Sequence, residues 1–438
     1  MKKAFHRFLG YLYEPVCYYR AKRLLNKKER WHNIQVEELV RILNYARKHC
    51  PYYSQLLNER VIDKTNAIDV LHCLPVLDKT IIRTEKVQSD EISAKWRNWA
   101  NTGGSTGEPL RFPRKGAPIP KRWEHINQMM LYILMGFKPY DKIVTFDGLT
   151  VSEVNRQKNI YFASCNRNFP YGIIRYSVLY ISKDTIKYYV ASLNKEKPRF
   201  IRSYPTAMLE FCKLLRQCDL FLNFTPKGCY LTSENFSQQD KDFISKTLGC
   251  PVWGQYGHTE LSVFAIQDPC NTYYLCSPVY GYTEILDNNC NSVKVGETGN
   301  LIVTGFINYG LPFIRYRTGD LAEYGGVTDT GATILSKLLG RDTDFVYDKD
   351  NNKLYLVGMI FGAHMHAFDC INSWQIIQEQ PGVVNLKIVK GVSFDNEAEN
   401  ELLAFFKKNN LVANLEYVSA IKKTKRGKQK FLIQRVTG

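Results

Sequence analysis

The sequence predicts an α/β protein with a large domain followed by a small C-terminal α+β domain. Three observations support this. Residues 1 to about 90 read as mostly helical, because residues 36–49 (VEELVRILNYARKH) repeat apolar side chains at the 3.6-residue spacing of a helix. From about Lys95 onward, short β-type runs alternate with amphipathic helical patterns. After Asp344, a strand–helix–strand pattern occupies the last stretch of about 94 residues.

The expected strands of the large domain are apolar runs that end in Gly, Ser or other loop-forming residues. Such runs predict strands whose C-terminal ends carry functional loops. They are residues 142–148, 200–205, 228–234, 251–257 and 300–306. In the small domain, a strand is expected over 383–389, a helix over 396–409 and a strand over 411–418. We expect a helical segment over 1–90 packed on a large domain over 91–341, and a small domain over 345–438.

Composition and charge describe an ordinary globular chain with basic ends. Hydrophobic residues make up 45% and charged residues 23% of 438 residues, and the net charge is +17. Nine Lys or Arg stand in residues 1–30, and seven in the last eighteen. A soluble basic surface explains this charge, and loose contact of residues 1–30 with an anionic membrane surface stays open. No nucleic-acid-binding motif accompanies the charge, so no specific nucleic acid is expected.

Location and cysteine use point to the cytoplasm. No apolar run approaches the roughly 20 residues of a spanning helix, and the N-terminus has no sustained apolar core. We expect a cytoplasmic protein, with a position at the inner membrane face as the alternative. The twelve cysteines are irregularly spaced and are expected to be reduced. A zinc site could use Cys250, His258, Cys270 and Cys276, but no Cys-x2–4-Cys pair supports it.

Residues 101–109 (NTGGSTGEP) concentrate glycines and hydroxyls at one point. Glycine permits close approach of a ligand to the main chain, and exposed N–H groups beside hydroxyls suit phosphate. A mobile hairpin turn is the alternative. The stretch is not a Walker A motif, because Glu108 stands where that motif requires lysine.

Residues 255–260 (QYGHTE) follow an expected strand. Thr259 could hydrogen-bond a phosphate oxygen, Glu260 could coordinate Mg²⁺, and Tyr256 could stack on a purine. A helix start capped by Thr259 is the alternative. Residues 314–324 (IRYRTGDLAEY) place Asp320 after a glycine at the end of a β-type run, where a carboxylate can accept both hydroxyls of a ribose; a Gly-Asp turn is the alternative.

Two basic residues lie further on. Arg341 stands near the expected domain boundary, where a plain surface cation is the alternative. Lys428 follows Gly427 in the basic segment 422–435, where it could be one charge of a solvated cluster. A flexible cation there could instead neutralise charge that develops on a carboxylate–phosphate adduct.

In this order, the motifs resemble those of the adenylate-forming (AMP-binding) superfamily. The closest likeness is to its phenylacetate–CoA ligase branch and the CapK-type relatives linked to capsular polysaccharide biosynthesis. The resemblance covers residues of about 70 to 438, and "YRTGD" and "TGGSTGEP" are its specific parts. It also includes "TSE" at 232–234 and "IRSYPTAM" at 201–208.

The resemblance implies a fold and a set of residue roles. A large adenylate-forming domain of mixed sheets and helices would bind nucleotide and acyl group, and a small mobile C-terminal domain would act as a lid. The phosphate loop would be Thr102, Gly103, Gly104, Ser105, Thr106 and Gly107. On the adenine side, the resemblance implies Ser233, Glu234, Tyr256 and Gly257. Thr259 would touch the α-phosphate, Glu260 would hold Mg²⁺, Asp320 would bind the ribose, Arg341 the ribose or phosphate, and Lys428 would stabilise the adenylation transition state.

The implied activity is ATP-dependent activation of a carboxylate, with release of pyrophosphate, followed by acyl transfer to a thiol such as coenzyme A. Transfer to an amine of an amino sugar or amino acid, and a non-catalytic relative that binds nucleotide or polyanions, are the alternatives. The acyl pocket could draw on residues 123–137 and 230–258, or residues 123–137 could be plain core. One departure stands at the hinge, where Thr343 occupies a position that usually holds Asp. Lys430 is the rival of Lys428, but no glycine precedes it.

Overall fold

The computed structural model of the chain describes residues 2–58, 60–91, 98–101, 110–114, 123–164, 172–356, 359–360, 365–424 and 427–436. The chain divides into two compact units. Unit 1 comprises Met1–Tyr11, Tyr140–Trp253 and Leu339–Gly438, and unit 2 comprises Leu12–Pro139 and Gly254–Leu338.

Helices dominate the N-terminal part of the chain, as the sequence predicts. They are α1 (Lys2–Leu25), α2 (Trp31–His49), α3 (Pro51–Leu56), α4 (Ala67–His72) and α5 (Lys79–Thr84). The apolar spacing of α2 gives it one buried face, to which Leu39, Ile42, Leu43 and Ala46 belong. A further helix, α6 (Trp123–Leu134), buries Ile126 and Met130 among others.

Antiparallel pairing characterises the strands of unit 2. A hairpin-like pair is formed by β1 (Asn98–Asn101) and β2 (Arg111–Arg114). The larger sheet has the order β11-β12-β13-β14-β10-β9. Its strands are β9 (Phe264–Gln267), β10 (Tyr274–Cys276), β11 (Gly281–Leu286), β12 (Thr298–Gly305), β13 (Tyr316–Val327) and β14 (Thr333–Arg341). The last part of β8 (Val252–Gly257) pairs with β9. The strands expected over 300–306 and 251–257 are thus confirmed as β12 and β8.

Unit 1 contains a mostly parallel sheet with the order β7-β6-β3-β5-β4. Its strands are β3 (Ile143–Asp147), β4 (Phe162–Ser164), β5 (Ile174–Ser177), β6 (Phe200–Ser203) and β7 (Gly228–Thr232), and only β4 pairs antiparallel. The helices between and after these strands are α7 (Glu153–Gln157), α8 (Ile186–Glu196), α9 (Pro205–Gln217) and α10 (Gln238–Leu248). Strands buried on both faces carry continuous apolar runs, which is why β3, β6 and β7 could be predicted.

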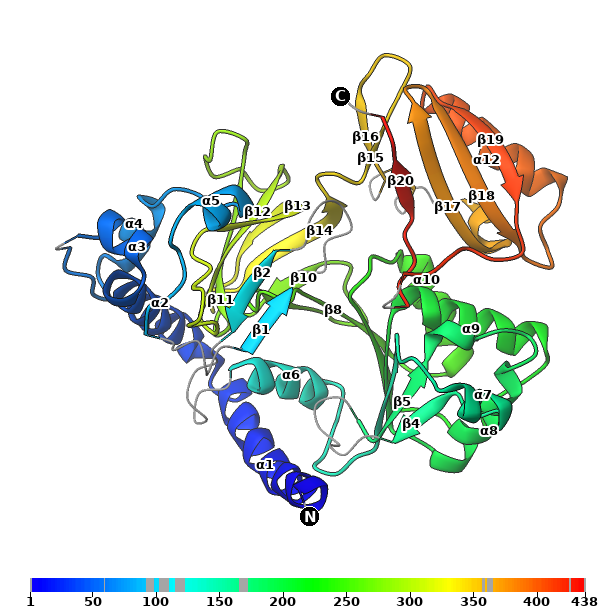
Figure 1. The fold of residues 1–438 in the computed structure, drawn as a ribbon, viewed down its shortest axis with the longest axis horizontal. Coiled ribbons are helices and arrows are strands. Elements are labelled where there is room, and N and C mark those ends of the chain that lie inside the picture. The colour runs from blue at the N-terminus through cyan, green and yellow to red at the C-terminus, as the bar shows by residue number, and fades with distance from the viewer. Residues whose placement is uncertain are drawn as a thin grey trace. The chain divides into compact units, whose positions relative to one another are not determined.

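The C-terminal part of unit 1 has a hydrophobic core of its own, to which Trp374, Ile376, Leu386, Leu402 and Phe406 belong. Its sheet has the order β19-β18-β17-β20, and α12 packs on one face (Figure 1). The elements are β15 (Phe345–Tyr347), β16 (Lys353–Tyr355), α11 (His366–Asp369), β17 (Ile371–Gln380), β18 (Val383–Lys390), α12 (Asn396–Lys408), β19 (Val412–Tyr417) and β20 (Leu432–Gln434). The predicted strands 383–389 and 411–418 and helix 396–409 are confirmed; β17 and β20 were not predicted.

The predicted fold class is confirmed: the chain is an α/β protein with a large sheet, surrounding helices and a separate C-terminal domain. Among the described residues, no helix is both long and apolar enough to cross a membrane.

A buried ion pair fixes the start of β13 in unit 2. Arg315 is 6% exposed, and its guanidinium donates to both carboxylate oxygens of Glu284, at 3.0 and 3.3 Å. It also donates to the backbone carbonyls of His72 and Leu74, at 2.9 and 2.6 Å. Burial raises the pKa of Glu284, and the Arg315 charge opposes that rise. The pair therefore joins β11 to the segment that follows α4.

We expect Arg315→Leu to lower the free energy of unfolding by about 3–5 kcal/mol, because it leaves the Glu284 carboxylate buried without its cation. Urea denaturation followed by circular dichroism measures this. Lys337→Met is the matched control, because the Lys337–Glu323 pair at 2.8 Å has an exposed lysine and should contribute less than about 1 kcal/mol. Equal losses of unfolding free energy in the two variants would contradict the conclusion that the buried Arg315–Glu284 pair stabilises unit 2.

Candidate functional site

Asp320 lies in a β-bulge of β13 in unit 2. Asn300 of β12 pairs with Leu321, whereas Ile302 pairs with Arg317, so β13 has two extra residues between these pairs. Gly319 adopts a φ of 78°, which glycine tolerates better than other residues. The expectation that Asp320 ends a β-type run is therefore wrong, and so is the alternative of a Gly-Asp turn. The strand continues, and the bulge redirects one carboxylate.

Tyr256 holds this carboxylate. Its hydroxyl donates to Oδ2 of Asp320 at 2.5 Å. Tyr256 is the next-to-last residue of β8, and Gly257 ends that strand. Asp320 is only 8% exposed, and its backbone N–H donates to the hydroxyl of Thr318 at 3.0 Å. A carboxylate fixed this way is an acceptor of defined direction for a ligand hydroxyl.

Glu260 is a second buried carboxylate in the same unit, at 7% exposure. Its Oε2 lies 3.2 Å from Nδ1 of His258, and its Oε1 accepts from the hydroxyl of Tyr316 at 3.4 Å. Thr259 is half-buried beside it. The two residues form a turn closed by the bond from the N–H of Leu261 to the carbonyl of His258 at 3.2 Å, so the alternative of a helix start is wrong.

The loop after β7 carries the predicted residues Ser233 and Glu234 in unit 1. Ser233 has a positive φ of 74°. Oε2 of Glu234 accepts from the N–H of Thr206 at 3.2 Å and from its hydroxyl at 2.6 Å. Thr206 is in the first turn of α9, where the helix dipole favours an anion. Burial nevertheless dominates, so the pKa of Glu234 is raised, against the effects of Thr206 and of the nearby Lys428.

Lys428 meets this loop. Its Nζ donates to the backbone carbonyl of Ser233 at 3.0 Å and lies 5.4 Å from the ring centre of Tyr204. The N–H of Gln429 donates to Oε1 of Glu234 at 3.3 Å. The structure therefore brings Lys428 to the predicted residues Ser233 and Glu234, although 195 residues separate Lys428 from Ser233.

Gly427 explains how the lysine segment comes this close. Its φ is 76°, and a Cβ atom there would lie 2.5 Å from a methyl of Val178 and 3.0 Å from the Cα of Gly148. A larger residue would push the segment away, so glycine is required immediately before Lys428.

The remaining predicted residues lie elsewhere or outside the described chain. Arg341 ends β14 and belongs to unit 1, and its carbonyl accepts from the N–H of Asp344 at 3.1 Å across a turn that contains Thr343. The loop Thr102–Gly107 lies outside the described residues. In the described part of the chain, no group of three or more His, Cys, Asp or Glu side chains could hold a metal ion.

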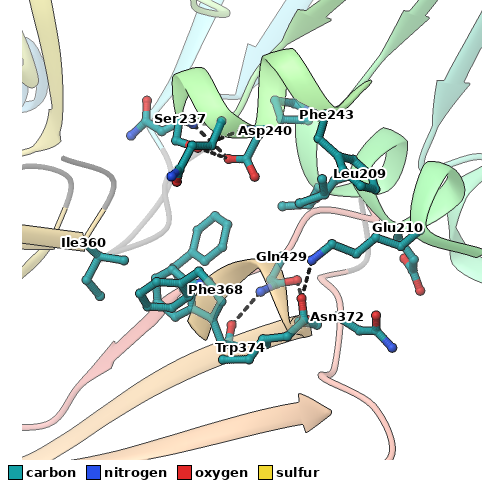
Figure 2. A pocket seen from close by; sticks show the side chains of 18 residues that line it. Leu209, Glu210, Ser237, Asp240, Phe243, Ile360, Phe368, Asn372, Trp374 and Gln429 are labelled. Carbon is teal, nitrogen blue, oxygen red and sulfur yellow. Dashed lines mark hydrogen bonds between the residues drawn. The ribbon is translucent and has the colours of Figure 1, made fainter. Parts of the chain in front are cut away.

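A cavity of about 110 Å³ in unit 1 lies where α9 and α10 face the C-terminal sheet (Figure 2). Phe368 and Trp374 line one side, and Leu209 and Phe243 the other. Gln429 contributes through its side chain, which donates to the carbonyl of Trp374 at 2.6 Å. The sequence did not indicate this cavity, because its walls come from segments more than a hundred residues apart.

Sequence reasoning also missed Thr206 and Gln429 as partners of Glu234. Thr206 lies within the stretch 201–208 that carried the resemblance, and Gln429 directly follows Lys428. These positions were the available signal, but neither residue type indicates a carboxylate partner by itself.

Comparison with known proteins shows which proteins this chain resembles. Residues 347–435 match the family of CapK C-terminal domains. The chain is 23% identical to Protein CapK of Staphylococcus aureus over 443 aligned residues, which cover 98% of this chain and 94% of that protein. Among solved structures, it is similar to a 2-hydroxyisobutyryl-CoA ligase in the postadenylation state with a bound acyl-AMP, with a TM-score of 0.67, 16% identity, and coverage of 91% of this chain and 88% of the ligase.

It is also similar to an anthranilate CoA ligase in complex with anthranoyl-AMP, with a TM-score of 0.50, 14% identity, and coverage of 76% of this chain and 65% of the ligase. The predicted resemblance to CapK-type relatives and to the adenylate-forming ligases is confirmed. The likeness to solved structures establishes the fold.

The raised pKa of Glu234 predicts a pH dependence of stability. A carboxyl whose pKa is higher in the folded chain contributes stability that is complete below its unfolded pKa and is lost as pH rises through the folded pKa. Glu234→Gln removes this titration. Its unfolding free energy relative to wild type should therefore rise as the pH increases above about 4, the usual pKa of a glutamate. Urea denaturation at several pH values measures the difference.

Asp287→Asn is the control of opposite sign. The N–H of Asn291 lowers the pKa of the exposed Asp287, so this variant should lose stability relative to wild type as the pH rises through the acid range. Parallel pH curves for Glu234→Gln and wild type would contradict the position assigned to Glu234.

Proposed function

We propose that this chain, which has the fold of the adenylate-forming ligases and a CapK C-terminal domain, activates a carboxylate with ATP. A carboxylate oxygen attacks the α-phosphorus, the bond to pyrophosphate breaks, and an acyl-adenylate forms. A thiol such as that of coenzyme A then attacks the acyl carbon, and AMP leaves. The observation that carries the proposal is the contact of the C-terminal segment with the loop after β7. The Lys428 ammonium donates to Ser233 and the backbone N–H of Gln429 donates to Glu234, and both acceptors belong to the predicted adenine side.

The two buried carboxylates of unit 2 support a nucleotide site. A buried carboxylate needs donors or a cation. Asp320, held by Tyr256, is suited to the ribose hydroxyls, and the Tyr256 ring to stacking on adenine. Glu260 offers the hard oxygen ligand that Mg²⁺ prefers, and Mg²⁺ would neutralise phosphate charge. Thr259, next to it, offers a hydroxyl to the α-phosphate.

The roles of three further parts stay proposals. The loop Thr102–Gly107 would bind the β- and γ-phosphates, and Arg341 the ribose or phosphate. Lys428 would neutralise charge as the carboxylate adds to the α-phosphate. No protein nucleophile is required, so positioning and electrostatic stabilisation supply the rate. The C-terminal domain would rotate between the two steps, with Thr343 in the hinge turn.

One alternative acceptor is the amine of an amino sugar or amino acid destined for a surface polysaccharide, as the resemblance of the motifs to CapK-type relatives implies. Attack by the amine would release AMP in the same way. For location, we propose the cytoplasm, with the basic residues 1–30 as the region that would contact an anionic membrane surface.

Exchange of labelled pyrophosphate into ATP tests the adenylation step, with aryl acids, fatty acids, amino acids and uronic acids as candidate substrates. We expect one class of acid to support exchange. Lys428→Ala should lower the exchange rate by about two or more orders of magnitude, the typical loss when one well-placed donor is removed.

Lys430→Ala is the matched control, because Lys430 is half-buried two residues away in the same segment. It should retain most of the exchange activity. An equal loss of exchange activity in both variants would contradict a specific catalytic role of Lys428 and would indicate that the positive charge of the whole segment matters. ATP binding without exchange for any acid would favour the non-catalytic alternative, and a protein that binds no ATP would rule out the proposed function.

A further inference from the structure

Lys428 is carried by a short turn with its own hydrogen bonds. The N–H of Thr424 donates to the carbonyl of Lys428 at 2.8 Å, and the N–H of Gly427 donates to the carbonyl of Thr424 at 2.8 Å. The hydroxyl of Thr424 accepts from the N–H of Lys428 at 3.1 Å. These bonds join Thr424 to Gly427 and Lys428, but they do not determine where these residues lie on the α9 side of unit 1.

Lys423, at the start of this turn, reaches across to the rest of unit 1. Its Nζ donates to Oε2 of Glu210 on α9 at 2.6 Å and to the backbone carbonyl of Val178 at 2.9 Å. Val178 is also the residue against which Gly427 packs. The segment is therefore held on both sides of Gly427, by Lys423 before it and by the contacts of Lys428 and Gln429 after it.

The environment of this ion pair distinguishes it from an ordinary surface salt bridge. The Lys423 side chain is 19% exposed and that of Glu210 is 33% exposed, and Glu210 lines the cavity of Figure 2. An exposed pair contributes little, whereas a charge-assisted hydrogen bond that is shielded from water contributes more. Because the Lys423 ammonium is engaged by a carboxylate and a carbonyl, it is unsuited to act on a reacting phosphate itself.

Two other contacts join the same surfaces without involving the lysine turn. The ammonium of Lys213 on α9 donates to the carbonyl of Ile371, and the side-chain amide of Gln217 donates to Oδ1 of Asn372 at 3.0 Å. They hold β17 against α9. Glu234 and Trp374 hold Gln429, after Lys428, whereas Lys423 holds the side of the turn that precedes Gly427.

We propose that Lys423 is a positioning residue for the adenylation step. Its ion pair with Glu210 sets the turn so that the ammonium of Lys428 meets the loop after β7. The expected effect of Lys423 on the reaction rate rests on the proposed function. The expected effect of Lys423 on the position of the turn rests only on the hydrogen bonds described above.

The test uses the full-length chain with Lys423→Met, Lys423→Arg and Glu210→Gln, and with Lys422→Met as control, since Lys422 is the exposed neighbour. Hydrogen exchange of a peptide that covers residues 421–431 reports the turn without any substrate. In Lys423→Met and Glu210→Gln, we expect the amide of Gln429, which donates to Glu234 outside the turn, to exchange about tenfold faster, which corresponds to one charge-assisted hydrogen bond. The amides of Gly427 and Lys428 bond within the turn and serve as internal references. Lys423→Arg should stay near wild type.

Pyrophosphate exchange supplies the second readout. Lys423→Met should lower kcat about tenfold and leave the KM for ATP within about twofold, because the lost interaction acts on the transition state. Unchanged amide exchange in Lys423→Met overturns the proposed position of the turn. Faster amide exchange with an unchanged kcat overturns the positioning role. If amide exchange changes as expected while wild type shows no pyrophosphate exchange with any acid, the proposed function fails and the ion pair still holds the turn.

Discussion

The carboxylate of Glu234 joins the two parts of unit 1 on which the account depends. It accepts hydrogen bonds from Thr206 at the start of α9 and from the backbone of Gln429 in the C-terminal segment. A lysine side chain is long and flexible, so its ammonium has a defined place only if its backbone does. Glu234 gives that backbone a place, at a cost that the raised pKa of the carboxyl reflects. The contact of Lys428 with Ser233 follows from this arrangement.

Local sequence patterns predicted the elements that are buried on both faces. The runs that became β3, β6 and β7 are continuous and apolar, and glycine or polar residues end them. The strand β17 was missed because it reads as mixed polar and apolar residues, and its pattern becomes clear only when β18 and β20 flank it. Asp320 was placed correctly after a glycine, but the bulge around it depends on pairing with β12, which the local sequence does not specify.

Some residues of the candidate site could be predicted from local motifs, and others could not. A resemblance of motifs was enough to select Ser233, Glu234 and Lys428, and the structure brings these three together. Thr206, which holds Glu234, could not be selected because its residue type does not indicate a carboxylate partner. The contacts of the C-terminal segment could not be selected because they join positions 195 to 245 residues apart. In a segment crowded with lysines, composition does not separate Lys423, which binds Glu210, from Lys428, which meets the loop after β7. Arg315 stands within the stretch of the ribose motif, yet its side chain serves a buried ion pair.

The most direct test of the account is the fate of a carboxylate oxygen. The acid that supports pyrophosphate exchange would be labelled with ¹⁸O in its carboxylate and carried through complete turnover with ATP and an acceptor thiol. Mass spectrometry of the products would then locate the label. Attack of the carboxylate on the α-phosphorus predicts one labelled oxygen in AMP. Label in inorganic phosphate, or none in AMP, would contradict adenylation and with it the role assigned to Lys428.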